Sequence, residues 1–265
     1  MLPRRSFLAL AVSSPAWAAK IDVPTRSVRV ARAFKSPGPK PNGLQATAEG
    51  LWILDQGDNR VYLTDYKSGK TLRAFDTDSK AGSGITFDGE ALWLASTYSR
   101  EIIRCDARTG KTIAKYSSPG SGVVAWSEGR HSPLAPPPKP ATAPKKAPGH
   151  RQATGAHGLE WRGGKLWISN PPSQTIYRMD PKAWKIEFHF PTAGDRPHGI
   201  GWEGDYLWCT DSNLNAFFKH DTATGKILER IQLTDSDPLP HGMTIHDGYM
   251  WYCDDVGVVC KFKLR

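Results

Sequence analysis

Histidine recurs at one fixed position of a motif that is repeated along this sequence. Three segments carry a His directly before a Gly, and in each of them a Trp follows that Gly nine positions later. These residues are His157, His198 and His241. Imidazole nitrogen is a preferred ligand of Zn, Fe and Cu, and three imidazoles leave positions on the ion for water or substrate. The pattern therefore predicts a divalent metal centre, and it does not choose among Zn, Fe, Cu and Ca.

Polar side chains also recur three positions after the same Trp. Asp211 and Asp254 occupy this position in the last two repeated segments. A carboxylate beside an ion or an imidazole can accept a proton or orient a ligand. We expect Asp211, Asp254 and His241 to be the catalytic residues. The metal ligands that we expect all stand directly before a Gly of the repeat, and they are His157, His198, His241 and Asn42.

Other uses of the same side chains are open at this point. Protonated imidazoles can bind an anion without a metal. Neutral ones can hydrogen-bond to the backbone of a neighbouring strand and hold strand ends in place. The Asp residues after the Trp can likewise cap the hairpin that follows them. The sequence therefore leaves a metal site, a metal-free site and a structural role as alternatives.

An internal repeat supplies the elements that must position these side chains. Five segments begin with a polar residue and Gly, continue through an apolar stretch and reach an apolar–Trp pair. In four units an Asp follows the Trp by thirteen positions, which is typical of a hairpin turn. Each unit contains about 42 residues with short alternating apolar runs, so it is interpreted as four antiparallel strands. The repeated Trp residues are Trp52, Trp93, Trp167, Trp208 and Trp251.

Units of this kind must stack to bury both faces, and a closed ring of them is a β-propeller. We therefore predict an all-β fold, a five-bladed β-propeller. Residues 27–34 alternate in polarity, and we expect them to close the ring as the outer strand of the last blade. A Pro-rich insertion at about residues 120–155 interrupts the period. Its segment 122–126 is similar to the start of a blade, so a six-bladed propeller is the alternative.

The chain is expected to contain a cleaved leader and one domain. Residues 1–18 carry the pair Arg4 and Arg5 and end in Ala-Trp-Ala, which is typical of a twin-arginine-type signal peptide. Residues 27–265 are expected to form a single propeller domain that includes the Pro-rich insertion. We therefore expect a bacterial protein that is exported to the periplasm or secreted.

Composition narrows the classes of partner. The formal net charge is +9, but Lys and Arg are scattered and no basic recognition motif is present, so no nucleic acid is expected. No apolar run approaches the roughly 20 residues that span a bilayer. We expect a small-molecule ligand at the central channel and consider a protein partner at the Pro-rich insertion. Cys253 and Cys260 can form a disulfide or remain buried thiols.

Residues 197–212 begin with Pro-His-Gly-Ile and end with Leu-Trp-Cys-Thr-Asp-Ser. This pattern resembles the repeat of the β-propeller superfamily that contains streptogramin (virginiamycin B) lyase, SMP-30/gluconolactonase, NHL-repeat and YncE-like periplasmic proteins. The resemblance covers about residues 28–265 except the insertion. Those families usually have six or seven blades, whereas five repeats are present here.

The resemblance implies a function and roles for particular residues. In lactonase-like members a metal lies on the channel axis, and in lyase-like members a His that matches His198 or His241 acts as a general base beside a metal. It thus implies a metal-dependent hydrolase or lyase that acts on an ester- or lactone-like small molecule. The alternative is a non-catalytic ligand-binding or scaffold propeller of the cell envelope. The positions that match lactonase-type metal ligands are Asn42, His157, His198 and His241 at strand starts and Asp55, Asp211 and Asp254 at strand ends.

Overall fold

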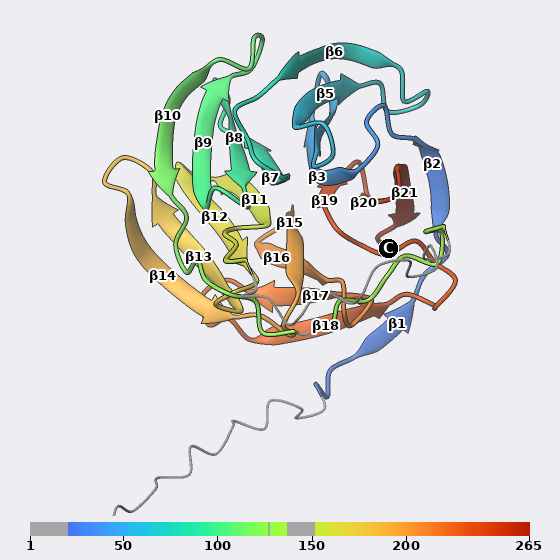
Figure 1. Ribbon diagram of the computed structural model, residues 1–265. Helices are drawn as coiled ribbons and strands as arrows, with labels where there is room; N and C mark the ends of the chain where they lie inside the picture. Colours follow the sequence, from blue (N-terminus) through green and yellow to red (C-terminus); the bar gives the residue numbers. More distant parts are fainter. Residues whose placement is uncertain (1–20, 127, 137–151) are drawn as a thin grey trace, which may run out of the picture.

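The chain folds into a closed ring of antiparallel β-sheets. The computed structural model describes residues 21–126, 128–136 and 152–265. Five sheets surround one axis as the blades of a propeller, and the chain passes through them in order around the ring (Figure 1). The predicted all-β, five-bladed β-propeller is confirmed, and no sixth sheet forms within the described ranges. No helix among these residues is long and apolar enough to cross a membrane.

Each blade contains four strands that follow one another from the axis to the outer edge. The innermost strands are β3 (Pro41–Thr47), β7 (Gly82–Phe87), β11 (Gly158–Arg162), β15 (Pro197–Glu203) and β19 (Met243–His246). The second strands carry the repeated Trp and are β4 (Gly50–Asp55), β8 (Ala91–Ser96), β12 (Lys165–Asn170), β16 (Tyr206–Asp211) and β20 (Tyr249–Asp254). The third strands are β5 (Arg60–Thr64), β9 (Glu101–Asp106), β13 (Thr175–Asp180), β17 (Ala216–Asp221) and β21 (Val258–Lys263). The outer strands are β6 (Thr71–Asp76), β10 (Thr112–Ser117), β14 (Lys185–Pro191), β18 (Ile227–Gln232) and β2 (Ala31–Lys35).

The N-terminal segment closes the ring, as predicted, and it does so in two places. Strand β2 pairs antiparallel with β21, and Phe34 lies opposite Val259 (Figure 1). Ahead of it, β1 (Thr25–Ser27) pairs in parallel with β18 as a fifth strand of the fourth blade. The single strand expected at residues 27–34 is therefore split. Val28 and Val30 pack against the core cluster between the last two blades, so the segment that joins β1 to β2 covers the seam.

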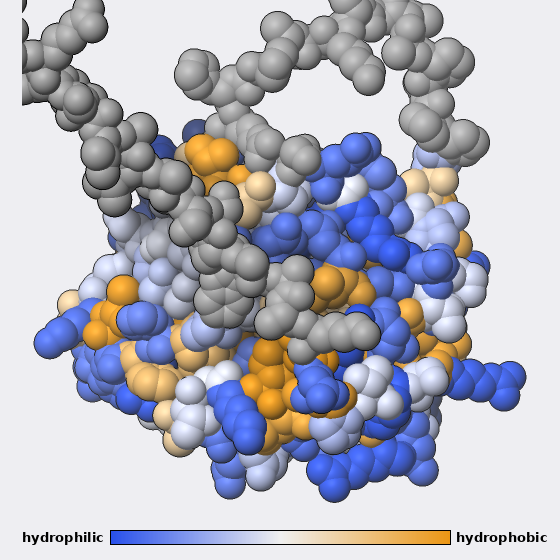
Figure 2. Space-filling model, turned by 90° about the horizontal axis from the view of Figure 1, so that it is seen from below, coloured by the Kyte–Doolittle hydropathy of each residue, from blue (hydrophilic) through white to orange (hydrophobic). Residues whose placement is uncertain are grey.

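The repeated Trp residues pack between blades, as expected for a structural role. All five are buried, and Trp208 is fully inaccessible. A basic side chain from the third or fourth strand lies over each of these indoles, for example Arg73 at 5.7 Å from the ring of Trp52 and Lys261 at 4.6 Å from that of Trp251. Part of the scattered positive charge is therefore used in cation–π contacts. On the face shown in Figure 2, hydrophobic residues lie in small groups among hydrophilic ones.

The Pro-rich insertion forms no strand in its described parts. Gly122 and Thr154 pair in one isolated bridge where the insertion leaves and rejoins the propeller. Segment 122–126 does not begin a sixth blade. The predicted signal peptide at residues 1–18 and residues 137–151 of the insertion lie outside the described residues.

The two Cys residues considered for a disulfide are free buried thiols. Cys253 lies opposite Val259, and Cys260 lies opposite Tyr252, so the two Cys side chains project from opposite faces of the strand pair. They accordingly belong to different core clusters. The register of β20 and β21 prevents a bond between them.

The repeated Gly brings the backbones of neighbouring blades into direct contact at the axis. A Cβ added to Gly43 would lie 2.6 Å from the carbonyl oxygen of Ser83, and one added to Gly84 would lie 2.8 Å from that of His157. In each blade the blocking atoms belong to the backbone at the start of the next innermost strand. The remaining contacts of this ring join Gly158 to His198, Gly199 to His241 and Gly242 to Asn42.

We expect Gly199→Ala to destabilise the fold. The new Cβ would overlap the backbone of Met243 and lie 2.8 Å from the carbonyl oxygen of His241, so β15 and β19 must separate. Overpacking of this kind costs about 1–3 kcal/mol, which urea unfolding measures. Gly122→Ala is the control, since its Cβ would make one ordinary contact, at 3.7 Å to Pro172. Equal unfolding free energies for the two variants would contradict the prediction.

Candidate functional site

The predicted His residues line one cavity at the end of the axis where the innermost strands begin. The cavity has a volume of about 400 Å³, and side chains from all five blades contribute to its wall. Four residues of the insertion, at positions 124, 126, 152 and 154, complete the lining. The blade residues are Asn42, Gln56, Thr97, Tyr98, His157, Arg196, His198, His241 and Asp255.

Three imidazoles from three successive blades lie in contact in this cavity. The ring centroids of His157 and His198 are 4.7 Å apart, and those of His198 and His241 are 4.8 Å apart. Both pairs meet edge to face, at interplanar angles of 71° and 88°. All three side chains are buried. The shared register of the repeat therefore brings together residues that are far apart in the sequence.

Each of the three imidazoles has its Nδ1 atom beside the carbonyl oxygen two residues earlier in the chain. His157 Nδ1 lies 3.1 Å from Gly155 O, His198 Nδ1 lies 3.2 Å from Arg196 O, and His241 Nδ1 lies 3.4 Å from the carbonyl oxygen of residue 239. A carbonyl oxygen only accepts hydrogen bonds, so the proton of each neutral ring is assigned to Nδ1. This assignment leaves the Nε2 lone pair as the acceptor, which is the state that metal-bound His residues adopt.

Burial keeps these rings neutral. Desolvation lowers the pKa of His157 to about 3 and holds the pKa of His198 well below its ordinary value. The pKa of His241 is lowered for the same reason. A charged imidazole would also be repelled by the Arg196 guanidinium, which contributes to the lowering in all three cases. Anion binding by protonated His is therefore disfavoured near neutral pH.

Asn42 takes the equivalent place in the first blade. Its side chain is 2 % exposed, and its Oδ1 atom is buried without a hydrogen-bond partner among the described residues. An amide oxygen in this state is available to a cation or to a ligand donor. Asn42 thus lies where the sequence placed it.

Two of the carboxylates that stand three positions after the repeated Trp have a local structural role. Asp55 Oδ2 accepts a hydrogen bond from Lys40 N at 2.7 Å, and Asp211 Oδ2 accepts one from Arg196 N at 2.9 Å. The other oxygen of Asp211 accepts from Leu214 N at 2.9 Å. Burial raises the pKa of Asp211 to about 6. Because both oxygens of Asp211 accept backbone hydrogen bonds, we assign no catalytic role to Asp211.

Asp254 differs from its equivalents because one of its oxygens is free. Its Oδ2 atom accepts hydrogen bonds from Leu239 N at 2.7 Å and from Ser132 Oγ of the insertion at 2.6 Å. Its Oδ1 atom is buried without a partner in the described residues. Burial raises the pKa of Asp254, and the neighbouring Asp255 raises it further.

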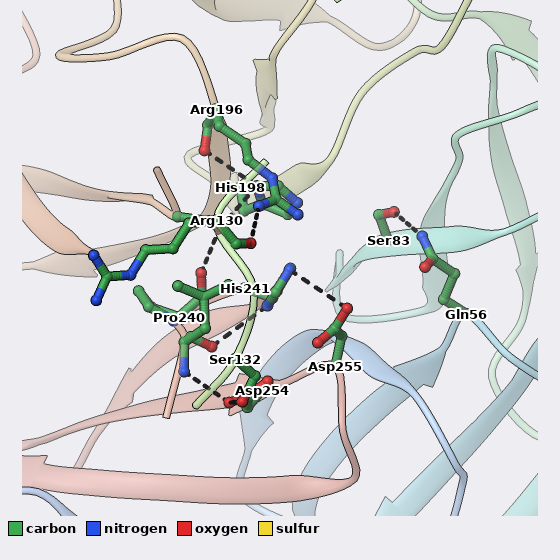
Figure 3. Close-up of polar contacts among 12 residues, drawn as sticks. Gln56, Ser83, Arg130, Ser132, Arg196, His198, Pro240, His241, Asp254 and Asp255 are labelled. Atoms are coloured by element: carbon green, nitrogen blue, oxygen red, sulfur yellow. Dashed lines mark hydrogen bonds and ion pairs between the residues drawn. The ribbon is translucent and has the colours of Figure 1, made fainter. Parts of the chain in front are cut away.

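Asp255 is a residue of the site that the repeat did not indicate. It follows β20 in the turn to β21 and lines the cavity, with its Oδ2 atom 4.0 Å from His241 Nε2 (Figure 3). The signal that could have revealed it is the Asp254-Asp255 doublet, which occurs in the last unit and in none of the other four.

The nitrogen and oxygen atoms of this site are chemically suited to bind a divalent ion. One group of three side chains also places its ligand atoms close enough together to share an ion. His241, Asp254 and Asp255 offer ligand atoms that all lie within 4.8 Å of one another. The three imidazoles do not form such a group within the described residues. Neutral imidazole and carboxylate oxygen are both ligands of first-row divalent ions. A divalent ion bound by His241, Asp254 and Asp255 is therefore compatible with these side chains.

The insertion roofs the cavity and bonds to its wall. The carbonyl oxygen of Arg130 accepts a hydrogen bond from Arg196 Nη1 at 2.7 Å, and Ser132 reaches Asp254 as described (Figure 3). Arg130 is itself held by Asn213 Oδ1 and by Asp235. The described part of the insertion is thus tied to the last two blades beside the imidazoles.

The fold and the axial site together define the class of this protein as a five-bladed β-propeller with a His-lined axial cavity. No protein-family model matches the sequence, and neither does any curated protein sequence. The comparison with solved structures supports a likeness at the level of the fold alone.

A similar solved structure is glutaminyl cyclase from Myxococcus xanthus, with a TM-score of 0.66 and 11% identity over 91% of this chain and 98% of that one. Virginiamycin B lyase from Staphylococcus aureus, solved with quinupristin, has a TM-score of 0.49 and 20% identity over 85% of this chain and 66% of that one. BamB from Moraxella catarrhalis has a TM-score of 0.42 and 11% identity over 83% of this chain and 71% of that one. These likenesses concern the fold and assign no activity.

We expect His157→Gln to remove part of the acid sensitivity of the fold. The pKa of His157 is about 3 in the folded chain against an ordinary value of 6.5, so the unfolded chain binds the proton first as the pH falls. Stability is therefore lost below pH 6.5, by about 2 kcal/mol between pH 7 and pH 5. Urea unfolding of metal-stripped protein at both pH values should show a drop larger by this amount in the wild type. The exposed His189→Gln serves as control, and equal drops in all three proteins would refute the assignment.

Proposed function

We propose that this propeller is a metal-dependent enzyme of hydrolase or lyase type that acts on a small ester- or lactone-like substrate in the axial cavity. The observation that carries the proposal is the set of three neutral imidazoles with Nδ1 engaged by carbonyl groups in one cavity. The resemblance of the repeat to lyase and lactonase propellers supports carbonyl chemistry. The predicted leader at residues 1–18 supports adding export to the periplasm or medium to the same proposal.

A divalent ion would be held by His241, Asp254 and Asp255, whose ligand atoms are mutually within reach. His157, His198 and Asn42 border the same cavity and would complete its surroundings. A bound divalent ion polarises a substrate carbonyl and lowers the pKa of a bound water. The Oδ1 atoms of Asn42 and Asp254, which are buried without partners in the described residues, support this donor set.

The remaining steps fall to the side chains. His198 lies between the other two imidazoles, and its neutral ring has an Nε2 lone pair that can accept a proton from water or from the substrate. The carboxylate of Asp255 and the Nε2 lone pair of His241 lie 4.0 Å apart, so both can donate electron pairs to one ion. Residues of the insertion line the cavity beside these groups.

A non-catalytic ligand-binding propeller is the second candidate. It is favoured by the spacing of the imidazoles, which do not offer three mutually close nitrogens, and by the cationic Arg196 in the same cavity. Such a protein would bind a small molecule without a metal. A protein partner at the insertion belongs to this candidate.

We expect the purified protein to bind one equivalent of Zn²⁺ or Co²⁺ after treatment with 1,10-phenanthroline and desalting. His241→Ala and Asp255→Asn each remove a donor and should weaken binding about ten-fold or more. Ester and lactone hydrolysis should fall with metal removal and return with the ion. Metal content, the Co²⁺ absorption spectrum and a chromogenic ester assay measure these effects.

His189→Ala is the matched control, because His189 is an exposed residue of β14 outside the cavity. It should leave metal binding unchanged. Absence of a stoichiometric metal together with unaltered hydrolysis after chelation would defeat the metal-dependent proposal. Absence of hydrolysis with and without the ion would leave the ligand-binding candidate.

A further inference from the structure

Arg196 is a cation in the wall of the axial cavity that has no carboxylate partner. All 26 acidic residues of the chain lie in the described ranges. None of their oxygens lies within the 4.0 Å ion-pair distance of this guanidinium, and Asp255, Asp211 and Asp195 act on it only from further away. The charge is therefore left unpaired by the protein itself.

An unpaired charge in a partly buried position is unfavourable unless a ligand supplies the opposite charge. Burial lowers the pKa of Arg196, which shows that its charged form is partly desolvated. Its side chain makes one hydrogen bond within the described residues, from Nη1 to Arg130 O. A guanidinium has five N–H donors in a planar fork, so most of its donor capacity remains for a molecule in the cavity.

The surrounding chain holds this guanidinium in place. Its Cζ atom lies 5.8 Å from the centroid of the Trp126 ring, and Gly129 passes so close that a Cβ there would lie 2.8 Å from Nη1. Trp126, Gly129 and Arg130 all belong to the insertion. The insertion thus positions Arg196 beside His198 (Figure 3).

The other groups in the cavity select the kind of anion. The neutral imidazoles present lone pairs rather than donors, and Asp255 adds a negative charge, so a dianion such as phosphate would meet acceptors on several sides. A single planar carboxylate matches the fork of Arg196 with two parallel hydrogen bonds. A cavity of about 400 Å³ then leaves room for a small organic body beside the imidazoles.

We infer that Arg196 binds the carboxylate of a small monoanionic ligand, so that the substrate of this site is an organic acid that carries a second, reactive carbonyl group. The assignment of that carbonyl rests on the proposed function. Binding of the carboxylate does not depend on it, because Arg196 needs neither a metal nor turnover.

The test uses metal-stripped mature protein in a buffer free of carboxylates. Acetate, hexanoate and benzoate are titrated by calorimetry, and the matched amides acetamide, hexanamide and benzamide are titrated beside them. We expect at least one acid to bind at one equivalent and to raise the melting temperature. The matched amide should bind to the wild type about ten-fold more weakly than the acid, or not at all. The acid should lose affinity to the same extent when it is titrated into Arg196→Met.

Arg178→Met is the control, since Arg178 lies over Trp167 away from the cavity, and it should leave binding unchanged. Arg196→Lys keeps the charge without the fork and should bind the acid more weakly than the wild type. Without ligand, Arg196→Met should melt no lower than the wild type, because it removes an unpaired, partly buried charge.

Equal binding of acid and amide, no binding of any acid, or full binding by Arg196→Met would overturn the inference. Acid binding without any metal dependence of hydrolysis would sink the proposed enzyme and leave the carboxylate site intact. Metal-dependent hydrolysis without any acid binding would support the proposed enzyme and overturn the carboxylate site.

Discussion

The structure depends on the contact between neighbouring backbones at the propeller axis. Each repeated Gly lies against the backbone at the start of the next innermost strand, and no side chain fits between them. Because this contact recurs in every blade, the residues just before the Gly positions share one level on the axis. Asn42, His157, His198 and His241 therefore meet at one cavity. The packing that closes the ring also sets the distances within the site.

The sequence indicated those residues of the candidate site whose type recurs at one position of the repeat. It did not indicate the residues whose type does not recur. The three His residues were predictable because one register fixes their place on the axis. Asp211 was predicted to be catalytic on the same reasoning, but its carboxylate caps the loop that enters its own blade. Arg196 stands two positions before a residue that the repeat singled out, and Asp255 stands one position after another. Both were missed because the residue types at these positions differ from blade to blade. The five blades and the closing strand were predictable from period alone, whereas the split of residues 27–34 depends on a seam that only packing reveals.

The chemistry of the cavity is unequal around the ring. Blades three to five supply imidazoles, whereas the first two supply amide and hydroxyl groups linked by hydrogen bonds, as between Ser83 and Thr97 at 2.8 Å. The insertion leaves the ring between these two halves and returns over the cavity. A ligand would therefore meet a basic, lone-pair-rich side and a neutral hydrogen-bonding side. This asymmetry favours one orientation of an unsymmetrical molecule, which a ring of identical residues would not.

The pairing of β2 with β21 sets a condition on how the protein is made. Residues near the start of the chain complete the blade formed by its end, so the ring cannot shut until the ribosome has released residues 258–263. Until then, two blade edges present unpaired backbone groups, which are the groups that pair wrongly with other chains. Contacts between such distant parts of a chain also form slowly. Nascent molecules thus pass through an open, edge-exposed stage, and chaperones that shield strand edges would matter most in that interval.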